Sequence, residues 1–269
     1  MVQLNIKTTA SELDEGMIES DLRPYLGMSQ IGHSCERYLW FAFRWCFTDS
    51  YSRRVGRLFN RGHREEEVII KDLERIGIEC YGDQTECNML GKHVSGHCDG
   101  MCTGVLEAPK TEHLLEFKTM NVNAYKDILK KGVQLSKPQY YAQLQLYMKG
   151  LKLKRALFIC VNKNDDAYYI ERVHYNAKAA KALVEKAQRV LMAEVPIDPP
   201  FAPTWYECKW CSAKDQCRQG KELHFTCRSC YYVSLGPEAT WLCNYNSEPE
   251  TINIARQRVG CTERKAIKI

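Results

Sequence analysis

The sequence lacks any run of about 18 apolar residues, the length that a transmembrane helix requires. Residues 1–9 also lack the apolar stretch of a signal peptide, and the chain has no internal repeat or low-complexity segment. These absences predict a cytoplasmic protein without membrane contact, in the host-cell cytoplasm if the protein is viral.

A strong excess of either charge is missing too, because the formal net charge is only +5. A mildly basic chain does not by itself indicate a nucleic-acid partner. The charges are unevenly placed, however: acidic residues crowd residues 12–21, and Arg53, Arg54, Arg57 and Arg61 cluster just before a predicted helix. That cluster is either an ordinary solvated face or a track for a phosphate-bearing substrate.

Cysteine, in contrast, is abundant, with 14 residues. In an intracellular chain this number indicates metal binding rather than disulfides. Seven cysteines lie from Cys208 onward, after a connector at residues 196–203 that holds four of the nine prolines. We therefore expect one domain over residues 1–220 and a small Cys-rich metal module over residues 221–269.

Hydrophobic periodicity predicts an α/β core with a central mixed sheet flanked by helices. The expected helices cover residues 35–47, 61–76, 138–151 and 177–194. The expected strands cover residues 79–87, 93–103, 113–120, 155–162 and 167–175.

The strand at residues 113–120 carries the main chemical signal. Side chains alternate along a strand, so Glu116 and Lys118 face one way while Leu115 and Phe117 point to the core. Asp99 lies upstream in a glycine-bounded turn. Two carboxylates suit Mg²⁺ or Mn²⁺, and a nearby ammonium can orient water or stabilise charge during phosphodiester hydrolysis. The alternative is a surface Glu–Lys pair.

Three further polar residues stand at helical spacings. His63 begins a helix, with Glu66 and Glu67 three and four positions on, and its alternative role is that of a cap or surface residue. Gln143 and Tyr147 lie one turn apart, and their alternative is a partly buried amphipathic helix.

Taken in order, these segments resemble the PD-(D/E)XK nuclease superfamily, specifically its RecB-like branch. The similarity is to CRISPR-associated RecB-like exonucleases, the AddB nuclease domain and phage exonucleases, and it spans residues 29–217. It implies a restriction-endonuclease-like core. One departure is Cys98, which stands where the superfamily often has a proline before the aspartate.

The resemblance also implies roles. His63, Asp99 and Glu116 would bind the catalytic metal, together with the backbone carbonyl of Phe117. Lys118 would serve the attacking water. Gln143 and Tyr147 would position the lysine and the DNA, and it stays open whether a glutamate supplements the histidine.

The first cysteine set, Cys208, Cys211 and Cys217, has the spacing C-x2-C-x5-C. This spacing fits zinc or an iron–sulfur cluster. The resemblance implies that Cys35 is the fourth ligand of a [4Fe-4S] cluster, and its alternative is an ordinary buried cysteine.

The second cysteine set comprises Cys227, Cys230, Cys243 and Cys261, and it fits a small zinc site with His224 as a competing ligand. A tail this short has little core of its own, so a metal would stabilise it. We expect packing roles for the remaining cysteines, Cys46, Cys80, Cys87, Cys98, Cys102 and Cys160.

The resulting expectation is a metal-dependent DNA exonuclease acting on single-stranded ends, 5′ to 3′, in recombination, replication or repair, alongside protein partners of those processes. Tyr38, Trp40, Tyr51 and the pair Tyr140–Tyr141 are candidates for stacking bases. Two alternatives stay open: a structure-specific endonuclease on the same core, and a non-catalytic nucleic-acid-binding protein. The sequence does not indicate an oligomeric state.

Overall fold

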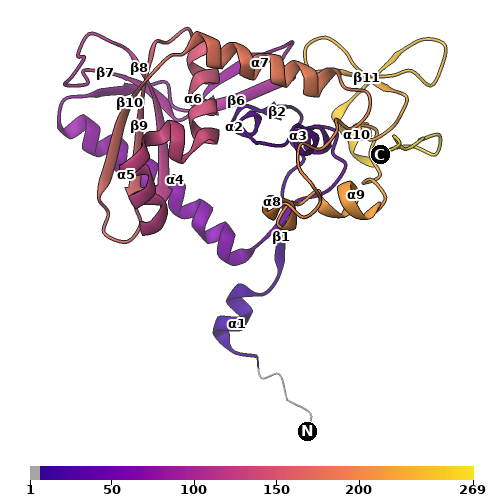
Figure 1. Ribbon diagram of the computed structural model, residues 1–269, viewed down its shortest axis with the longest axis horizontal. Coiled ribbons are helices and arrows are strands. Elements are labelled where there is room, and N and C mark those ends of the chain that lie inside the picture. Colours follow the sequence, from indigo (N-terminus) through magenta and orange to yellow (C-terminus); the bar gives the residue numbers. More distant parts are fainter. Residues whose placement is uncertain (1–6) are drawn as a thin grey trace.

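The computed structural model describes residues 7–269 and is built around a five-stranded sheet (Figure 1). The strand order is β10-β9-β8-β7-β4, and β8 and β9 are parallel while the other pairs are antiparallel. The mixed α/β architecture predicted from the sequence is therefore confirmed. The strands are β4 (Glu79–Tyr81), β7 (Gly100–Thr103), β8 (His113–Met120), β9 (Arg155–Asn162) and β10 (Tyr168–His174).

Helices cover both faces of this sheet. The helix α4 (Arg53–Arg75) packs on one face, where Ile69 and Leu73 meet Leu115 and Phe117. The other face is covered by α5 (Val122–Ser136) and α6 (Pro138–Gly150), and α7 (Ala177–Met192) packs on α6. The expected alternation along β8 is confirmed, but the face that carries Glu116 is buried as well.

A second group of elements comes from the N-terminal part of the chain. The three-stranded sheet β2-β6-β5 adjoins α6, and β1 pairs with β3 ahead of α4. The helix α1 projects from the body of the molecule (Figure 1). Their bounds are α1 (Thr9–Asp14), β1 (Met17–Glu19), β2 (Leu26–Gly27), α2 (Met28–Ile31), α3 (Glu36–Phe43), β3 (Ser50–Ser52), β5 (Thr85–Met89) and β6 (Val94–Cys98).

The C-terminal part folds back onto α3, and α8 and α9 lie beside that helix (Figure 1). Trp241 and Ile252 belong to the same buried cluster as Trp40 of α3, so one apolar core continues across residue 220. The elements are α8 (Tyr206–Lys209), α9 (Lys214–Gln219), β11 (Val233–Leu235), β12 (Trp241–Cys243), β13 (Glu250–Ile252) and α10 (Ile254–Val259). The domain boundary at 220 stays a prediction.

Several element predictions were wrong. The strands expected over residues 79–87 and 93–103 are each divided in two, and the halves belong to different sheets. The helix expected from residue 61 begins at Arg53, because Ser52 caps it with a hydroxyl that accepts from the Val55 amide at 3.4 Å. The arginine cluster thus lies on the helix, not before it. The helix expected to reach residue 47 ends at Phe43, and Trp45 has a left-handed φ of 52°. No helix was expected where α5 lies.

Among the described residues, no helix combines the length and the apolar character that crossing a membrane would need. The signal-peptide interpretation concerned residues 1–9, of which residues 1–6 lie outside the described part of the chain.

Candidate active site

The sheet brings Asp99 next to Glu116. Asp99 lies between β6 and β7, and β7 pairs with β8 so that Gly100 is opposite Leu115. The backbone amide of Phe117 donates a 2.7 Å hydrogen bond to Oδ2 of Asp99. Gly100 has φ +151°, a conformation that favours glycine, and a Cβ there would lie 3.3 Å from the Tyr81 carbonyl. The glycine turn therefore orients the carboxylate of Asp99 toward the strand that carries Glu116.

Glu116 has no exposed surface, and its two carboxylate oxygens differ in their partners. Oε1 accepts hydrogen bonds from Lys118 Nζ and, at 2.9 Å, from Gln143 Nε2. Oε2 has no hydrogen-bond partner among the described residues. A buried carboxylate oxygen without a partner is costly, and a cation ligated there would remove that cost. Oε2 is thus the atom that best fits a metal ion.

Burial also sets the protonation of this carboxylate. It raises the pKa of Glu116 to about 7, against the attraction of Lys118 and with a further contribution from Asp99. Burial likewise raises the pKa of Asp99, opposed by Lys118 and by the Phe117 amide. Both carboxyl groups are therefore harder to ionise than free carboxylic acids, and a bound cation would favour their ionised forms.

Lys118 contacts both neighbours on its own strand. Its ammonium donates to Glu116, donates to the Phe117 carbonyl at 3.0 Å, and lies 5.4 Å from the ring centroid of Tyr140. Burial disfavours the ammonium, but Glu116 and Asp99 outweigh it and hold the pKa of Lys118 above its ordinary value. Lys118 is therefore a permanent cation, suited to stabilising negative charge rather than to accepting a proton.

The structure places Glu66 deeper in the site than His63. The His63 side chain is 77% exposed, whereas that of Glu66 is 27% exposed, and Nδ1 of His63 lies 3.7 Å from Oε1 of Glu66. Burial and then Asp99 raise the pKa of Glu66, so these two carboxylates act on each other electrostatically. In the sequence, the spacing of three helical positions made Glu66 a candidate to supplement His63. It did not indicate that Glu66 is the more enclosed of the two.

Gln143 and Tyr147 project from α6 toward β8 and β6. Gln143 holds Glu116, while the Tyr147 hydroxyl donates to the His97 carbonyl at 2.8 Å. Gly96 makes room for this ring, since a Cβ there would lie 2.6 Å from the Tyr147 hydroxyl. Both side chains are buried, and Gln143 positions the glutamate rather than the lysine.

A cleft of about 1020 Å³ opens in front of these residues. Phe117, Lys118 and Tyr140 line its floor, and α4 forms a wall that includes His63 and Glu66. Asp99 and Glu116 do not line it; they lie behind Phe117 and Lys118. Five cationic side chains line the cleft against two carboxylates, namely Arg23, Arg53, Arg57, Lys118 and Lys163 against Glu65 and Glu66.

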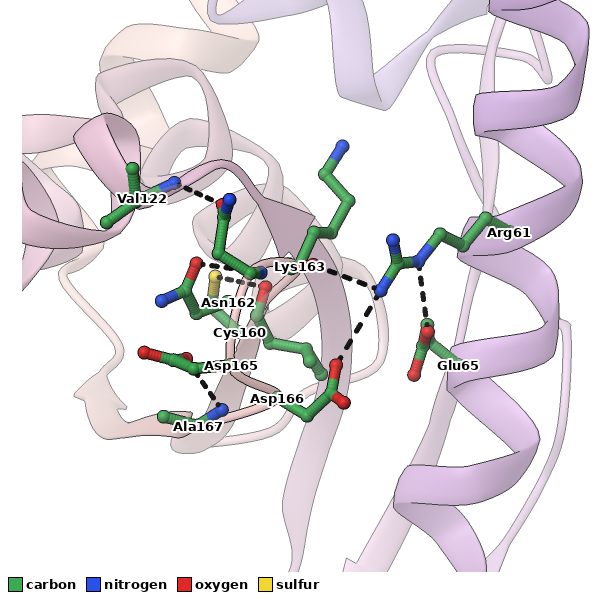
Figure 2. A network of polar contacts seen from close by, with 11 residues as sticks. Arg61, Glu65, Val122, Cys160, Asn162, Lys163, Asp165, Asp166 and Ala167 are labelled. Carbon is green, nitrogen blue, oxygen red and sulfur yellow. Dashed lines mark hydrogen bonds and ion pairs between the residues drawn. The ribbon is translucent and has the colours of Figure 1, made fainter.

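Arg61 connects α4 to the turn between β9 and β10 (Figure 2). From α4 it donates to Glu65 at 3.3 Å and to the Lys163 carbonyl at 3.4 Å, and it lies 3.6 Å from Asp166. Figure 2 shows the Lys163 side chain extending away from this network. Arg61 therefore fixes the turn between β9 and β10, and leaves Lys163 as the cation that faces the cleft.

Two other arginines of the predicted cluster hold the N-terminal segment. Arg53 donates to the Glu15 carbonyl at 2.9 Å, and Arg57 donates to the Leu13 carbonyl at 3.2 Å and pairs with Asp14. The acidic and basic stretches noted in the sequence thus contact each other. The arginine cluster is neither a bare solvated face nor a wholly free substrate track.

The stacking candidates differ in their accessibility. Trp40 is fully buried and donates from Nε1 to the Ala193 carbonyl at 2.8 Å, so its assignment as a base-stacking residue was wrong. Tyr51 and Tyr140 line the cleft. Tyr38 and Tyr141 line other hollows of the surface.

The first cysteine set comes together around a cavity of about 180 Å³. Cys35 caps α3, and the chain at α8 and α9 brings the other three thiols opposite it. Arg37 Nε donates to Cys217 Sγ at 3.2 Å across a sequence separation of 180. Burial raises the pKa of Cys35, and Cys217 and Cys208 add to it. The four thiols predicted to act together therefore line one cavity.

The second cysteine set is also gathered. Burial raises the pKa of Cys227, and Cys261, Cys230 and Cys243 raise it further, so these three thiols lie within electrostatic reach of Cys227. His224 is not among these influences and lies 3.4 Å from the Thr48 hydroxyl. Over residues 7–269, however, no three His, Cys, Asp or Glu side chains are spaced closely enough to hold a metal ion as they stand.

No protein-family model matches the sequence. No curated protein matches it either. Among solved structures, the fold is similar to an alkaline exonuclease of Laribacter hongkongensis, with a TM-score of 0.47 and 16% identity over 62% of this chain and 86% of that chain.

The same enzyme in complex with dAMP gives a TM-score of 0.45 and 16% identity over 63% of this chain and 87% of that chain. A phage-related exonuclease from Haemophilus somnus gives 0.39 and 13% identity over 49% of this chain and 68% of that chain. Each likeness is distant, so the chemistry of the site rests on the side chains of this chain.

Proposed function

We propose that the chain is a divalent-metal-dependent deoxyribonuclease of the RecB-like branch, acting as an exonuclease on single-stranded DNA. The observation that carries the proposal is the buried, unpartnered Oε2 of Glu116, next to Asp99 and to the cation of Lys118. A structural ion pair would satisfy both oxygens of its carboxylate. A site that receives a metal ion keeps one of them available.

In this proposal Asp99, Glu116 and the Phe117 carbonyl hold Mg²⁺ or Mn²⁺, and Glu66 or His63 completes the set. A bound divalent cation neutralises the phosphate and lowers the pKa of the attacking water. Lys118, charged throughout, donates to the developing negative charge on the phosphate oxygens. Gln143 keeps Oε1 of Glu116 occupied, so that Oε2 points to the ion.

The test is a digest of end-labelled DNA with Mg²⁺ or Mn²⁺. We expect wild-type protein to release labelled mononucleotides from linear single strands, 5′ ends first, and to leave circular single strands intact. Glu116→Gln should lose at least a thousandfold in rate, as for removal of a group that acts directly on the transition state. Glu112→Gln, an exposed glutamate just before the same strand that bonds Tyr81, is the matched control.

Retained cleavage by Glu116→Gln would overturn the catalytic assignment. Cutting of circular strands would replace the exonuclease by an endonuclease. DNA binding without cleavage, in wild-type protein with either metal, would favour a non-catalytic nucleic-acid-binding protein.

We infer further that the first cysteine set holds a [4Fe-4S] cluster. Its four thiols line one hollow, and four cysteine thiolates are the usual ligand set of such a cluster. Anaerobic purification should give a brown protein that contains iron. Cys35→Ala should lose the iron and the colour, while Cys46→Ala, a buried cysteine just beyond the same helix, should keep both. A colourless protein with zinc in this set would contradict the cluster.

We infer that the second cysteine set binds one zinc ion. The other three thiols of the set raise the pKa of Cys227, and this proximity supports the assignment. Cys227→Ser should remove one equivalent of zinc, and Cys80→Ser on β4 should remove none. An unchanged zinc content in Cys227→Ser would contradict it.

A further inference from the structure

An aromatic pair lies in the cleft away from the carboxylates. The rings of Tyr51, on β3, and Phe59, on α4, lie 5.1 Å apart at 73°. Both residues line the cleft, and Phe59 is 53% exposed. A pair of aromatic rings inside a polar, cationic cleft is not explained by the core, because neither ring belongs to a buried cluster.

Gly56 is the position of α4 at which Tyr51 of this pair packs against the helix. A Cβ at Gly56 would lie 3.5 Å from Cε2 of Tyr51 and 3.2 Å from Cδ1 of Ile18. The Tyr51 ring therefore lies close to the α4 backbone at Gly56, one turn before Phe59. The pair therefore packs against α4 on one side and is exposed to the cleft on the other.

Phe59 lies on the same stretch of helix surface as the site. Residues four and three positions apart share a helix face, so Phe59, His63 and Glu66 follow one another along α4. The seven positions from Phe59 to Glu66 correspond to about 10 Å along the axis. Stacked nucleotides advance by about 3.4 Å each, so this distance equals that of roughly three nucleotides.

The charges between the pair and the site suit a phosphate backbone. Five cations line the cleft against two carboxylates, and Lys163 and Phe59 both belong to its lining. The ammonium of Lys163 makes no hydrogen bond or ion pair with any residue that the structure describes. A single strand can therefore set its phosphates toward these cations and its bases toward the rings.

We propose that Tyr51 and Phe59 form a stacking platform for unpaired bases, about three nucleotides from the phosphate to be cut. The proposal rests on the proposed function for the position of that phosphate. Bases in a duplex are stacked on both sides and paired, so they cannot lie on the rings. The platform thus selects single strands over duplexes.

The experiment measures binding without metal, so that no DNA is cut. Fluorescence anisotropy in EDTA gives the dissociation constants of three labelled probes: oligothymidylate of about 12 nucleotides, an abasic deoxyribose-phosphate strand of the same length, and a blunt duplex. The variants are Phe59→Ala, Tyr51→Ala, Phe59→Trp and, as a control, Ile170→Ala. Ile170 lies on β10, is also 53% exposed, and does not line the cleft.

We expect wild-type protein to bind oligothymidylate at least tenfold more tightly than the abasic strand, from stacking of one or two bases. Phe59→Ala and Tyr51→Ala should each weaken oligothymidylate binding roughly tenfold and leave the abasic strand and the duplex unchanged. Phe59→Trp should retain binding, which excludes misfolding as the cause. Ile170→Ala should behave as wild type.

Oligothymidylate binding by Phe59→Ala at the wild-type level would overturn the platform, as would equal losses for the abasic strand. These outcomes are separable from failure of the proposed function. If the protein cuts DNA but Phe59→Ala does not change oligothymidylate binding, the proposed nuclease function stands and the stacking platform is disproved. If Phe59→Ala weakens oligothymidylate binding as expected but the wild-type protein never cuts DNA, the stacking platform stands and the proposed nuclease function is disproved.

Discussion

Gln143 donates a 2.9 Å hydrogen bond to one oxygen of Glu116 and leaves the other oxygen without a partner. A side chain from α6 therefore fixes the orientation of a carboxylate on β8. The carboxylate of Glu116 is thus oriented by a residue that does not line the cleft.

Loss of this hydrogen bond should weaken metal binding. We expect Gln143→Leu to lower the affinity for Mn²⁺ by about 10–100-fold, the usual effect of removing a group that orients a metal ligand. Isothermal titration calorimetry measures the change directly. Gln145→Leu is the matched control, because Gln145 is buried on the same helix but bonds the His174 carbonyl and the Asn176 amide. Equal losses in both variants would show that α6 had merely been destabilised.

Metal binding should depend on pH through Glu116. Its pKa is raised to about 7, so below that pH the carboxyl carries a proton that the metal must displace. We expect the affinity for Mn²⁺ to fall up to about tenfold per pH unit below 7 and to level off above it. Titrations at several pH values check this, with Glu112→Gln retaining the slope. An affinity independent of pH near 7 would be inconsistent with the raised pKa.

The same shift has a consequence for the stability of the metal-free protein. The folded-state pKa of Glu116 exceeds its ordinary value of 4.5, so the folded protein binds the proton more tightly than the unfolded chain does. The contribution of Glu116 to stability is therefore complete below about pH 4.5 and is lost as the pH rises through about 7. We expect saturating Mn²⁺ to raise the melting temperature more at pH 8 than at pH 6, since only the ionised carboxylate binds the ion. A metal-induced shift of equal size at the two pH values would contradict this linkage.

The contact between Asp14 and Arg57 should restrain DNA binding. Asp14 pairs with an arginine that lines the cleft, so it competes there with a phosphate. We expect Asp14→Asn to tighten binding of oligothymidylate about two- to fivefold at low salt, because exposed pairs are weak and screened. Glu12→Gln, on the same helix but paired with Lys7, should have no effect. Weaker binding by Asp14→Asn would mean that the N-terminal segment helps to hold the strand.

Arg228 should be essential to the C-terminal part of the fold. It is almost fully buried, lies 3.8 Å from the ring centroid of Trp45 and 4.6 Å from that of Trp241, and donates to Gln257 and to the carbonyls of Phe43 and Pro24. A lysine cannot stack on two rings and reach three acceptors at once. We therefore expect Arg228→Lys to lower the free energy of unfolding by about 2–4 kcal/mol, measured by urea titration.

The neighbouring Arg256 is the control for that prediction, because it is exposed and pairs with Glu250. Arg256→Lys should change stability by less than about 0.5 kcal/mol. Equal effects of the two substitutions would argue against a special role for the buried guanidinium.

Much of the sheet could be predicted from the sequence. The strands β8 and β9 have the predicted bounds because long apolar runs bury both of their faces. The helix α7 begins at the predicted residue because Asn176 accepts from the Ala179 amide. Local chemistry alone determines these features.

Other features depend on contacts that the sequence does not reveal. The start of α4 was missed because Gly56 weakens the helical signal, while contacts of Arg53 and Arg57 with the N-terminal segment support that turn. The burial of Trp40 follows from the packing of α7 and the C-terminal segment around α3. The greater enclosure of Glu66 relative to His63 depends on the packing of α4 against β8.

The bonds that Arg37 and Arg228 make across 180 and 185 residues have a kinetic consequence. During synthesis α3 leaves the ribosome about 180 residues before these packing partners do. Contacts of such long sequence separation slow folding, because a large loop must close before they form. The surroundings of α3 are therefore completed only after the segment that holds Cys217 and Arg228 has been synthesised. A chain truncated before Cys208 should lack this packing and expose the aromatic residues of α3 that the full packing buries.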